Sequence, residues 1–157
     1  MQPTQPNRAA RRQRGFSLVE VLIALVIMSV GMLGIAGLYV QSMQAGRTSM
    51  LRHHAVTLAG DVADRIRANP RAGIAYEGQG VDGSCVSGVV NCDPVTMAGH
   101  DILLWQQQAV DTLPAGNVVI TFDDSGIPPL YTIAVNWAEP GANPPPSYSI
   151  TIPVLPN

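Results

Sequence analysis

The sequence predicts an α+β fold in which a long N-terminal α-helix packs on a small antiparallel β-sheet. Three observations lead to this prediction. Residues 21–40 form an uncharged apolar run, an apolar stripe with helical spacing continues almost to Pro70, and three short alternating segments occupy the C-terminal part. The first two features indicate one continuous helix, and the third indicates strands joined by short connections.

Composition excludes several classes of protein. The chain has 157 residues, of which 46% are apolar and 13% are charged, so it is too apolar for a disordered chain. A net charge of -2 argues against a nucleic-acid-binding surface. Two cysteines are too few for a disulfide-dense scaffold. A chain of this length makes one or two domains.

Charge is distributed unevenly along the chain. The first fifteen residues contain four arginines and no acid (Arg8, Arg11, Arg12, Arg14), and no charged residue lies between Glu20 and Arg47. As a helix, the apolar residues 21–40 would span about 30 Å, the thickness of the hydrocarbon core of a membrane. The basic end is expected to stay in the cytoplasm, and everything after the run is expected to cross the membrane.

Neither of the two ordinary kinds of membrane segment, a signal peptide or a plain anchor, fully explains this pattern. A cleaved secretory signal peptide would have a shorter apolar core of roughly 7–15 residues and a small-x-small cleavage site, which residues 39–45 do not provide. A plain single-pass anchor explains the length but not Glu20, which lies inside the apolar run. An acid within a membrane helix costs roughly 2.5–3.5 kcal/mol on insertion scales, so it normally marks function.

Residues 14–20 read Arg-Gly-Phe-Ser-Leu-Val-Glu and resemble the prepilin-peptidase recognition site of type IV pilins and pseudopilins. The resemblance implies a cut between Gly15 and Phe16, N-methylation of Phe16 and an assembly role for Glu20. It also implies a type IV pilin-like fold. The implied partners are the prepilin peptidase, the inner-membrane pilus assembly machinery, and other minor and major pilins.

This resemblance divides the chain into three parts. They are a cleaved basic leader (1–15), the transmembrane and filament-core half of the long helix (16–45), and a periplasmic head (46–157). The mature chain would cross the inner membrane once and later enter a cell-surface pilus. In the family, the glutamate of an incoming subunit neutralises the N-terminal amine of its neighbour. A pair within one chain, between Glu20 and the amine of Phe16, is the alternative.

Beyond the membrane the helix is expected to continue over residues 46–68. Its apolar residues recur every three or four positions and form one stripe: Leu51, Ala55, Leu58, Val62 and Ile66. Asp61 and Arg65 lie off this stripe at the spacing and in the order that favour an ion pair. Asn69-Pro70 ends the helix, because a residue before proline avoids the α region.

Residues 69–95 are predicted to form an irregular loop rich in glycine and serine. The loop contains Cys85 and Cys92, whose spacing is not that of a C-x-x-C redox motif. Two thiols without histidine partners also make a poor zinc site. In an oxidising periplasm the sequence therefore predicts a disulfide between them.

The C-terminal part is predicted to contain a short helix and a sheet. The helix covers residues 96–113 and includes His100 near its start, and the sheet covers 117–155. Its strands are expected at 118–122, 131–137 and 148–154, with turn residues between them. Short connections between successive strands imply an antiparallel meander, with Pro153 in an edge strand.

No motif for catalysis occurs in the sequence, so an enzyme is not expected. There is no G-x-S-x-G segment and no phosphate-binding loop. Asp123 and Asp124 suit a solvated turn better than a general acid and base. His53, His54 and His100 lack acids and cysteines at ligand spacing, so neither a metal nor another cofactor is expected.

A second resemblance narrows the family. Residues 59–70 end in Arg-Ala-Asn-Pro and resemble the helix end of the minor pilins called type IV pilus modification proteins (PilV-like). The two cysteines, the Trp105 segment ending in Leu113-Pro114 and the 131–137 strand fit the same subgroup. The resemblance implies a low-abundance subunit that is incorporated in the pilus or primes its assembly, at the tip. The alternatives are a minor pseudopilin of a type II secretion system and a membrane-anchored periplasmic binding protein.

Overall fold

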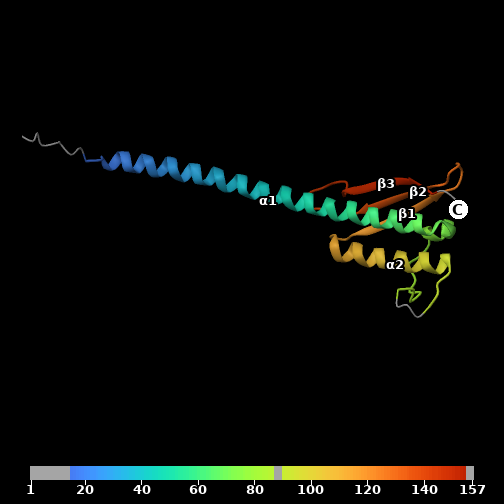
Figure 1. Cartoon of the computed structure of the whole chain (residues 1–157). Coiled ribbons are helices and arrows are strands. Elements are labelled where there is room, and N and C mark those ends of the chain that lie inside the picture. Colours follow the sequence, from blue (N-terminus) through green and yellow to red (C-terminus); the bar gives the residue numbers. More distant parts are fainter. Residues whose placement is uncertain (1–14, 87–89, 155–157) are drawn as a thin grey trace, which may run out of the picture. The chain divides into compact units, whose positions relative to one another are not determined.

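The computed structural model describes residues 15–86 and 90–154, so the leader arginines lie outside the described residues. Its elements, in chain order, are α1 (Leu18–Ala68), the 3-10 helix η1 (Pro70–Glu77), α2 (Pro94–Thr112), β1 (Asn117–Asp123), β2 (Leu130–Asn136) and β3 (Ser147–Pro153) (Figure 1). The long helix and the small antiparallel sheet confirm the predicted α+β class. The chain divides into two compact units, Met1–Gln44 and Ala45–Asn157, and the second is called the head below.

Helix α1 is a single helix of 51 residues that contains no proline. It carries Glu20 in its first turn and Arg65 and Arg67 in its last turn, which suits the helix dipole at both ends. The predicted apolar stripe of its second half is buried in the head. Among the described residues, α1 contains the one stretch long and apolar enough to cross a membrane.

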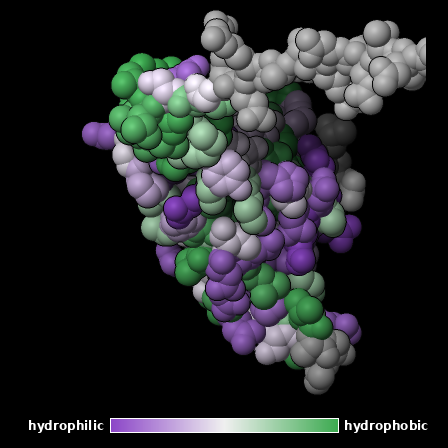
Figure 2. Space-filling view, turned by 90° about the vertical axis from the view of Figure 1, so that its left-hand side faces the viewer, coloured by the Kyte–Doolittle hydropathy of each residue, from purple (hydrophilic) through white to green (hydrophobic). Residues whose placement is uncertain are grey.

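The first half of α1 presents large apolar side chains outward. Leu22, Val26 and Leu33 are all more than half exposed, as are most of the other large apolar residues from Phe16 to Met43. In the space-filling view these residues form a dense green cluster at the upper left (Figure 2). Such a surface needs apolar surroundings, because a water-soluble monomer rarely exposes so large an apolar area.

Two elements differ from the prediction for the middle of the chain. The loop expected over 69–95 contains the 3-10 helix η1, which starts at Pro70 and buries Ala72 and Tyr76. Helix α2 begins at Pro94, two residues earlier than predicted, and ends at Thr112. It begins there because the Asp93 side chain accepts hydrogen bonds from the N–H groups of Val95 and Thr96, both at 2.9 Å.

His100, expected near the start of this helix, lies in the second turn of α2, where it is buried. The chain then passes from α2 to β1 through Gly116. A Cβ atom at Gly116 would lie against the carbonyl of Ala109, so only glycine fits this close approach.

The sheet is a three-stranded antiparallel meander in the order β1-β2-β3. In β2, buried residues alternate with less buried ones, so that Tyr131, Ile133 and Val135 face the core. Ile133 stands opposite Ile120 of β1 and Ile150 of β3. Strand β3 forms one edge and ends at Pro153, a position that proline tolerates.

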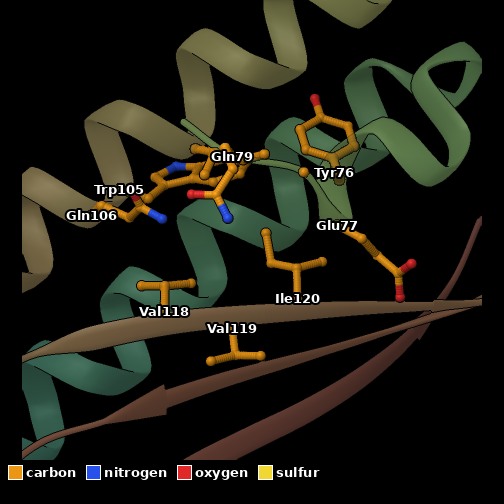
Figure 3. A pocket seen from close by; sticks show the side chains of 10 residues that line it. Tyr76, Glu77, Gln79, Trp105, Gln106, Val118, Val119 and Ile120 are labelled. Atoms are coloured by element: carbon orange, nitrogen blue, oxygen red, sulfur yellow. The ribbon is translucent and has the colours of Figure 1, made fainter. Parts of the chain in front are cut away.

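One apolar core joins the sheet to both helices within the head. Leu58, Val62 and Ile66 of α1 share this core with Trp105 of α2 and with Ile133. In Figure 3, Val118 and Ile120 of β1 point toward Trp105 of α2. Large buried aromatic and branched side chains supply most of the stabilisation, at about 25 cal/mol per Å² of apolar surface removed from water.

Candidate functional site

The peptide bond between Gly15 and Phe16 lies just before α1. Both residues precede Leu18, where the helix begins, and Phe16 is 83% exposed. A Cβ atom at Gly15 would meet no other atom within 4 Å, so the fold of this chain does not itself require a glycine here.

Glu20 lies in the first turn of α1, where the unpaired N–H groups of the helix favour an anion. The Ser17 carbonyl accepts hydrogen bonds from the N–H groups of Glu20 (3.1 Å) and Val21 (3.2 Å). Helical bonding therefore begins at Ser17 and leaves Phe16 outside the helix.

In the apolar half of α1, the backbone and the Ser29 hydroxyl find their hydrogen-bond partners within the helix. The Ser29 hydroxyl lies 2.9 Å from the carbonyl oxygens of both Leu25 and Val26. The backbone is helical throughout, so every interior N–H group has a carbonyl partner. A helix of this kind is stable in hydrocarbon or against other apolar helices, where water is absent. Glu20 is the exception, since its carboxylate needs a partner outside the helix.

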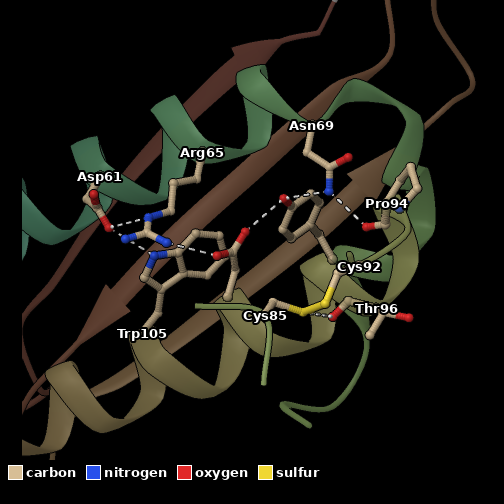
Figure 4. A network of polar contacts seen from close by, with 10 residues as sticks. Asp61, Arg65, Asn69, Cys85, Cys92, Pro94, Thr96 and Trp105 are labelled. Carbon is tan, nitrogen blue, oxygen red and sulfur yellow. Dashed lines mark hydrogen bonds and ion pairs between the residues drawn. A yellow bond between two sulfur atoms is a disulfide. The ribbon is translucent and has the colours of Figure 1, made fainter. Parts of the chain in front are cut away.

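In the head, a polar network joins α1 to α2 (Figure 4). Arg65 donates from Nη1 to Asp101 Oδ1 at 2.9 Å, and its Nε lies 3.4 Å from Asp61 Oδ2. Trp105 Nε1 donates to the same oxygen of Asp61 at 3.0 Å. The side chain of Asp101 is only 4% exposed, so Arg65 supplies the positive charge that this buried carboxylate requires.

A second branch of the network joins the end of α1 to η1 and α2. Asn69 donates from Nδ2 to the carbonyl of Pro94 at 2.8 Å and to the Tyr76 hydroxyl at 3.2 Å. Tyr76 in turn donates to Asp101 Oδ2 at 3.2 Å. The ring of Tyr76 also stacks on Trp105, with centroids 5.8 Å apart. Asn69 therefore holds three segments together.

Burial and charge shift the ionisation of two members of this network. Burial raises the pKa of Tyr76, although the hydrogen bond from Asn69 opposes the shift. Partial burial acts against the charge of Arg65, but the hydrogen bond to Asp101 and the nearby carboxylates outweigh it, so the pKa of Arg65 is raised. Both groups keep their protons at neutral pH, and the network therefore keeps its charges.

The loop between η1 and α2 is closed by a disulfide between Cys85 and Cys92, the pair that the sequence predicts. Their Cα atoms are 5.7 Å apart. The carbonyl oxygen of Thr96, in the first turn of α2, lies 3.9 Å from the sulfur of Cys85. A bonded sulfur has no proton to donate, so this is a packing contact that brings the loop close to α2.

Two family models match the chain in succession. The prokaryotic N-terminal methylation motif matches residues 10–36, and the family described as type IV pilin Tt1218 matches residues 37–103. The chain belongs to the type IV pilin superfamily. No curated protein and no solved structure gives a significant match. As a pilin, the chain is a structural subunit with a methylation motif at its N-terminus.

The predicted site residues of this pilin fall in two places. Gly15, Phe16 and Glu20 lie together around the start of α1, all within the matched methylation motif. Cys85 and Cys92 lie in the head, where they form the disulfide. In residues 15–86 and 90–154, no group of three or more histidine, cysteine or acidic side chains is placed to hold a metal ion.

The residues that hold the head of the pilin together were not among the predicted site residues. Asp61 and Arg65 were expected to pair only with each other, whereas each also bonds to α2. Asp101 and Trp105 indicate such contacts in the sequence. Each lies on a largely apolar helix, and a carboxylate or an indole N–H needs a hydrogen-bond partner when it is buried. The Arg-Ala-Asn-Pro ending places Asn69 where its side chain reaches α2.

Removing the disulfide is expected to destabilise the head of this pilin moderately. Replacing both Cys85 and Cys92 by serine frees a short loop in the unfolded chain. The chain-entropy model then gives a loss of about 2–3 kcal/mol in the free energy of unfolding. Denaturant unfolding of the full chain in detergent would measure the loss. Two free thiols in a non-reducing mass measurement of the native protein would contradict the disulfide itself.

Alkaline pH is expected to weaken the head through Tyr131. Its hydroxyl donates to the Gly73 carbonyl at 2.7 Å, and Gly73 has a φ of +53° that glycine adopts readily. Burial, with a contribution from the charge of Glu77, raises the pKa of Tyr131 from 10.0 to about 12. Because the folded-state pKa is the higher one, this stabilisation is complete below about pH 10 and is lost as the pH rises through about 12.

Denaturant unfolding at a series of alkaline pH values checks this expectation. Position 131 cannot ionise in Tyr131→Phe, so the stability of this variant should fall less steeply between about pH 10 and pH 12 than that of the wild type. Equal slopes for the two proteins would show that Tyr131 does not cause the alkaline loss.

Proposed function

We propose that this pilin is a minor, low-abundance subunit of a type IV pilus. The prepilin peptidase removes residues 1–15 by cutting between Gly15 and Phe16, and Phe16 then carries the N-methyl group. One observation carries the proposal: an exposed Gly15–Phe16 bond lies directly before an apolar helix whose first turn holds Glu20. The matched methylation motif over residues 10–36 supports the same conclusion.

Before assembly, the chain crosses the inner membrane once. The arginine-rich leader stays in the cytoplasm, because basic residues flank the cytoplasmic end of a membrane span. The head then lies in the periplasm, an oxidising compartment that suits the disulfide between Cys85 and Cys92. Leaving the membrane, the apolar half of α1 would exchange contacts with lipid for contacts with the helices of other subunits.

In the pilus, the proposed role is to prime assembly together with other minor pilins, at or near the tip. Residues 59–70 support the minor role through their resemblance to type IV pilus modification proteins. The structure gives this segment a physical purpose, because Asp61, Arg65 and Asn69 attach α2 to α1 and so define the shape of the head. A defined head is what a subunit with specific neighbours requires.

Mass spectrometry of the N-terminus of the native protein tests the proposal. We expect the mature chain to begin at Phe16 with one methyl group on its amine. A chain that retains Met1 and the arginine-rich leader while functioning normally would overturn the proposal. The variant Gly15→Leu provides a control, since a bulky side chain at the cut should leave the leader attached while the distant head folds unchanged.

Deletion of the gene separates this role from its alternatives. Loss of pili and of twitching motility supports a pilus subunit, whereas loss of protein secretion with normal pili would indicate a pseudopilin of a type II system. A ligand-binding protein would need a deep apolar pocket of roughly 300–1,000 Å³. The cavity between η1, α2 and β1 measures about 170 Å³, which is below this range. Two hollows of about 410 and 500 Å³ reach the range in volume, but they lie open on the surface and are not deep pockets.

A further inference from the structure

Strand β1 has an outer edge without a neighbouring strand. The strand order β1-β2-β3 places β1 at the side of the sheet. In an antiparallel pair, successive residues alternately bond to the neighbour and point away from it. The N–H of Phe122 points away from β2, because it donates to Glu77 Oε1 at 2.6 Å. The backbone groups of Val118 and Ile120 therefore point outward as well.

These outward groups are not satisfied within the described part of the chain. Neither the N–H nor the carbonyl of Val118 or Ile120 has a hydrogen bond to another described residue. Unpaired N–H and carbonyl groups along a strand edge form a template for another strand. Glu77 occupies the N–H of Phe122, so the free part of this edge covers residues 118–120.

The free edge borders a cavity of about 170 Å³ (Figure 3). The side chains of Val118 and Ile120 point into the cavity from β1, and those of Trp105 and Tyr76 lie across it. The amide side chains of Gln79 and Gln106 also line it, and they offer both donors and acceptors. The cavity can therefore receive a side chain from a segment that lies along the edge.

Charge around this edge is negative. Glu77 lines the cavity, Asp123 ends β1, and no arginine lines the cavity. Residues 45–157 as a whole contain five arginines and ten acids. A partner segment with basic residues therefore matches this surface, whereas a second copy of the same acidic head would be repelled.

We propose that the edge of β1 at Val118 and Ile120 binds a short extended segment of another pilin head, one that carries a basic residue. The segment adds as a fourth strand and exchanges backbone hydrogen bonds with these two residues. The outward N–H and carbonyl groups of Val118 and Ile120 are two residues apart, and a partner must present its own donors and acceptors at the same spacing. An extended strand does so, whereas a helix or a small molecule does not. This proposal rests on the proposed function, because it takes the partner to be a pilin.

Amide hydrogen exchange of the full mature chain in detergent tests the proposal. Each full-length pilin encoded beside this gene serves as a probe, added singly. With one of them we expect exchange at the N–H groups of Val118 and Ile120 to slow by about tenfold or more. The N–H groups of Val119 and Thr121 are the internal control, because they already lie in the ladder with β2 and should change little.

A matched pair of variants separates this edge from the rest of the head. Gln106→Trp fills the cavity, whereas Gln107→Trp places the same side chain on the adjacent, exposed position of α2 that does not line it. Only Gln106→Trp should abolish the slowed exchange. Unfolding measurements on both variants show whether each head is still folded.

Three results would overturn the proposal. Binding of a pilin without slowed exchange at Val118 and Ile120 would refute the strand addition and leave the proposed function intact. The proposal would also be refuted if exchange at Val118 and Ile120 slowed when the concentration of this chain alone was raised. The partner would then be a second copy of the chain, and the proposed function would stay intact. If none of the pilins binds, the partner of this edge is not a pilin. If the native chain keeps its leader, both this proposal and the proposed function are refuted.

Discussion

Replacing Arg65 by methionine is expected to destabilise the head by about 2–3 kcal/mol. The variant keeps a side chain of similar length but leaves Asp101, whose side chain is 4% exposed, without a positive partner. Removing one partner of a buried pair costs about 3–5 kcal/mol. We expect a value below that range, because the Arg65 side chain is itself 45% exposed and water screens part of its interaction.

Arg67→Met provides the control for this experiment. Arg67 lies two residues away and pairs with Asp64 at 3.1 Å, but both side chains are at least half exposed. An exposed pair of this kind contributes little, so its loss should change the free energy of unfolding by less than about 0.5 kcal/mol. Denaturant unfolding of the three full chains in detergent measures the difference. Equal losses for Arg65→Met and Arg67→Met would show that Asp101 does not depend on Arg65.

The Asp101→Asn variant tests the same pair from the other side. It removes the buried charge and leaves Arg65 able to turn toward water or Asp61. The loss should therefore be smaller than for Arg65→Met, since no buried charge is left alone. A larger loss for Asp101→Asn would mean that the hydrogen bond from Tyr76, and not the charge pair, holds the two helices together.

Local patterns in the sequence predict the long helix and the sheet well. The apolar stripe from Leu51 to Ile66 repeats at helical spacing and is buried, and the alternation around Ile133 gives the core face of β2. These elements are predictable because each depends on residues close in sequence. The start of α2 follows from local sequence too, since Asp93 followed by Pro94 is typical of a helix start.

Contacts between distant residues could not be predicted in the same way. Arg65 and Asp101 are 36 residues apart, and Asp61 and Trp105 are 44 residues apart. The spacing of Asp61 and Arg65 indicated only their mutual pair, because nothing local shows which element will lie beside them. Residues 70–77 lacked a helical pattern for the same reason: η1 is held by Asn69 and by the stacking of Tyr76 on Trp105, both tertiary contacts.

The proposed N-terminal site could be inferred from the sequence because a processing motif depends on sequence alone. The proposed peptidase would read an exposed segment, so Gly15 and Phe16 would need no folded partner. Glu20 stood out because a carboxylate in an apolar helix is costly wherever the helix lies. The structure adds the helix start at Leu18, which leaves Phe16 free to reach another molecule.

Replacing Glu20 by glutamine is expected to leave cleavage intact and to lower incorporation into the filament by on the order of a hundredfold. The variant keeps the size of the side chain and removes its charge. The methylated amine of a neighbouring subunit would then be buried among apolar helices without a counterion, and an unpaired buried charge costs several kcal/mol. The amount of the chain in sheared pili, relative to the amount in the membrane, measures incorporation.

Ser29→Ala is the matched control for the Glu20 variant. Ser29 is also a polar residue in the apolar half of α1, but its hydroxyl bonds to carbonyls of its own helix, so assembly should not depend on it. The two variants distinguish cleavage from incorporation. Gly15→Leu should block cleavage of the leader, whereas Glu20→Gln should lower only incorporation into the filament. If Glu20→Gln chains are cut, methylated and found in pili at the wild-type level, Glu20 does not neutralise a neighbour's amine, and the acid in this helix must serve another purpose.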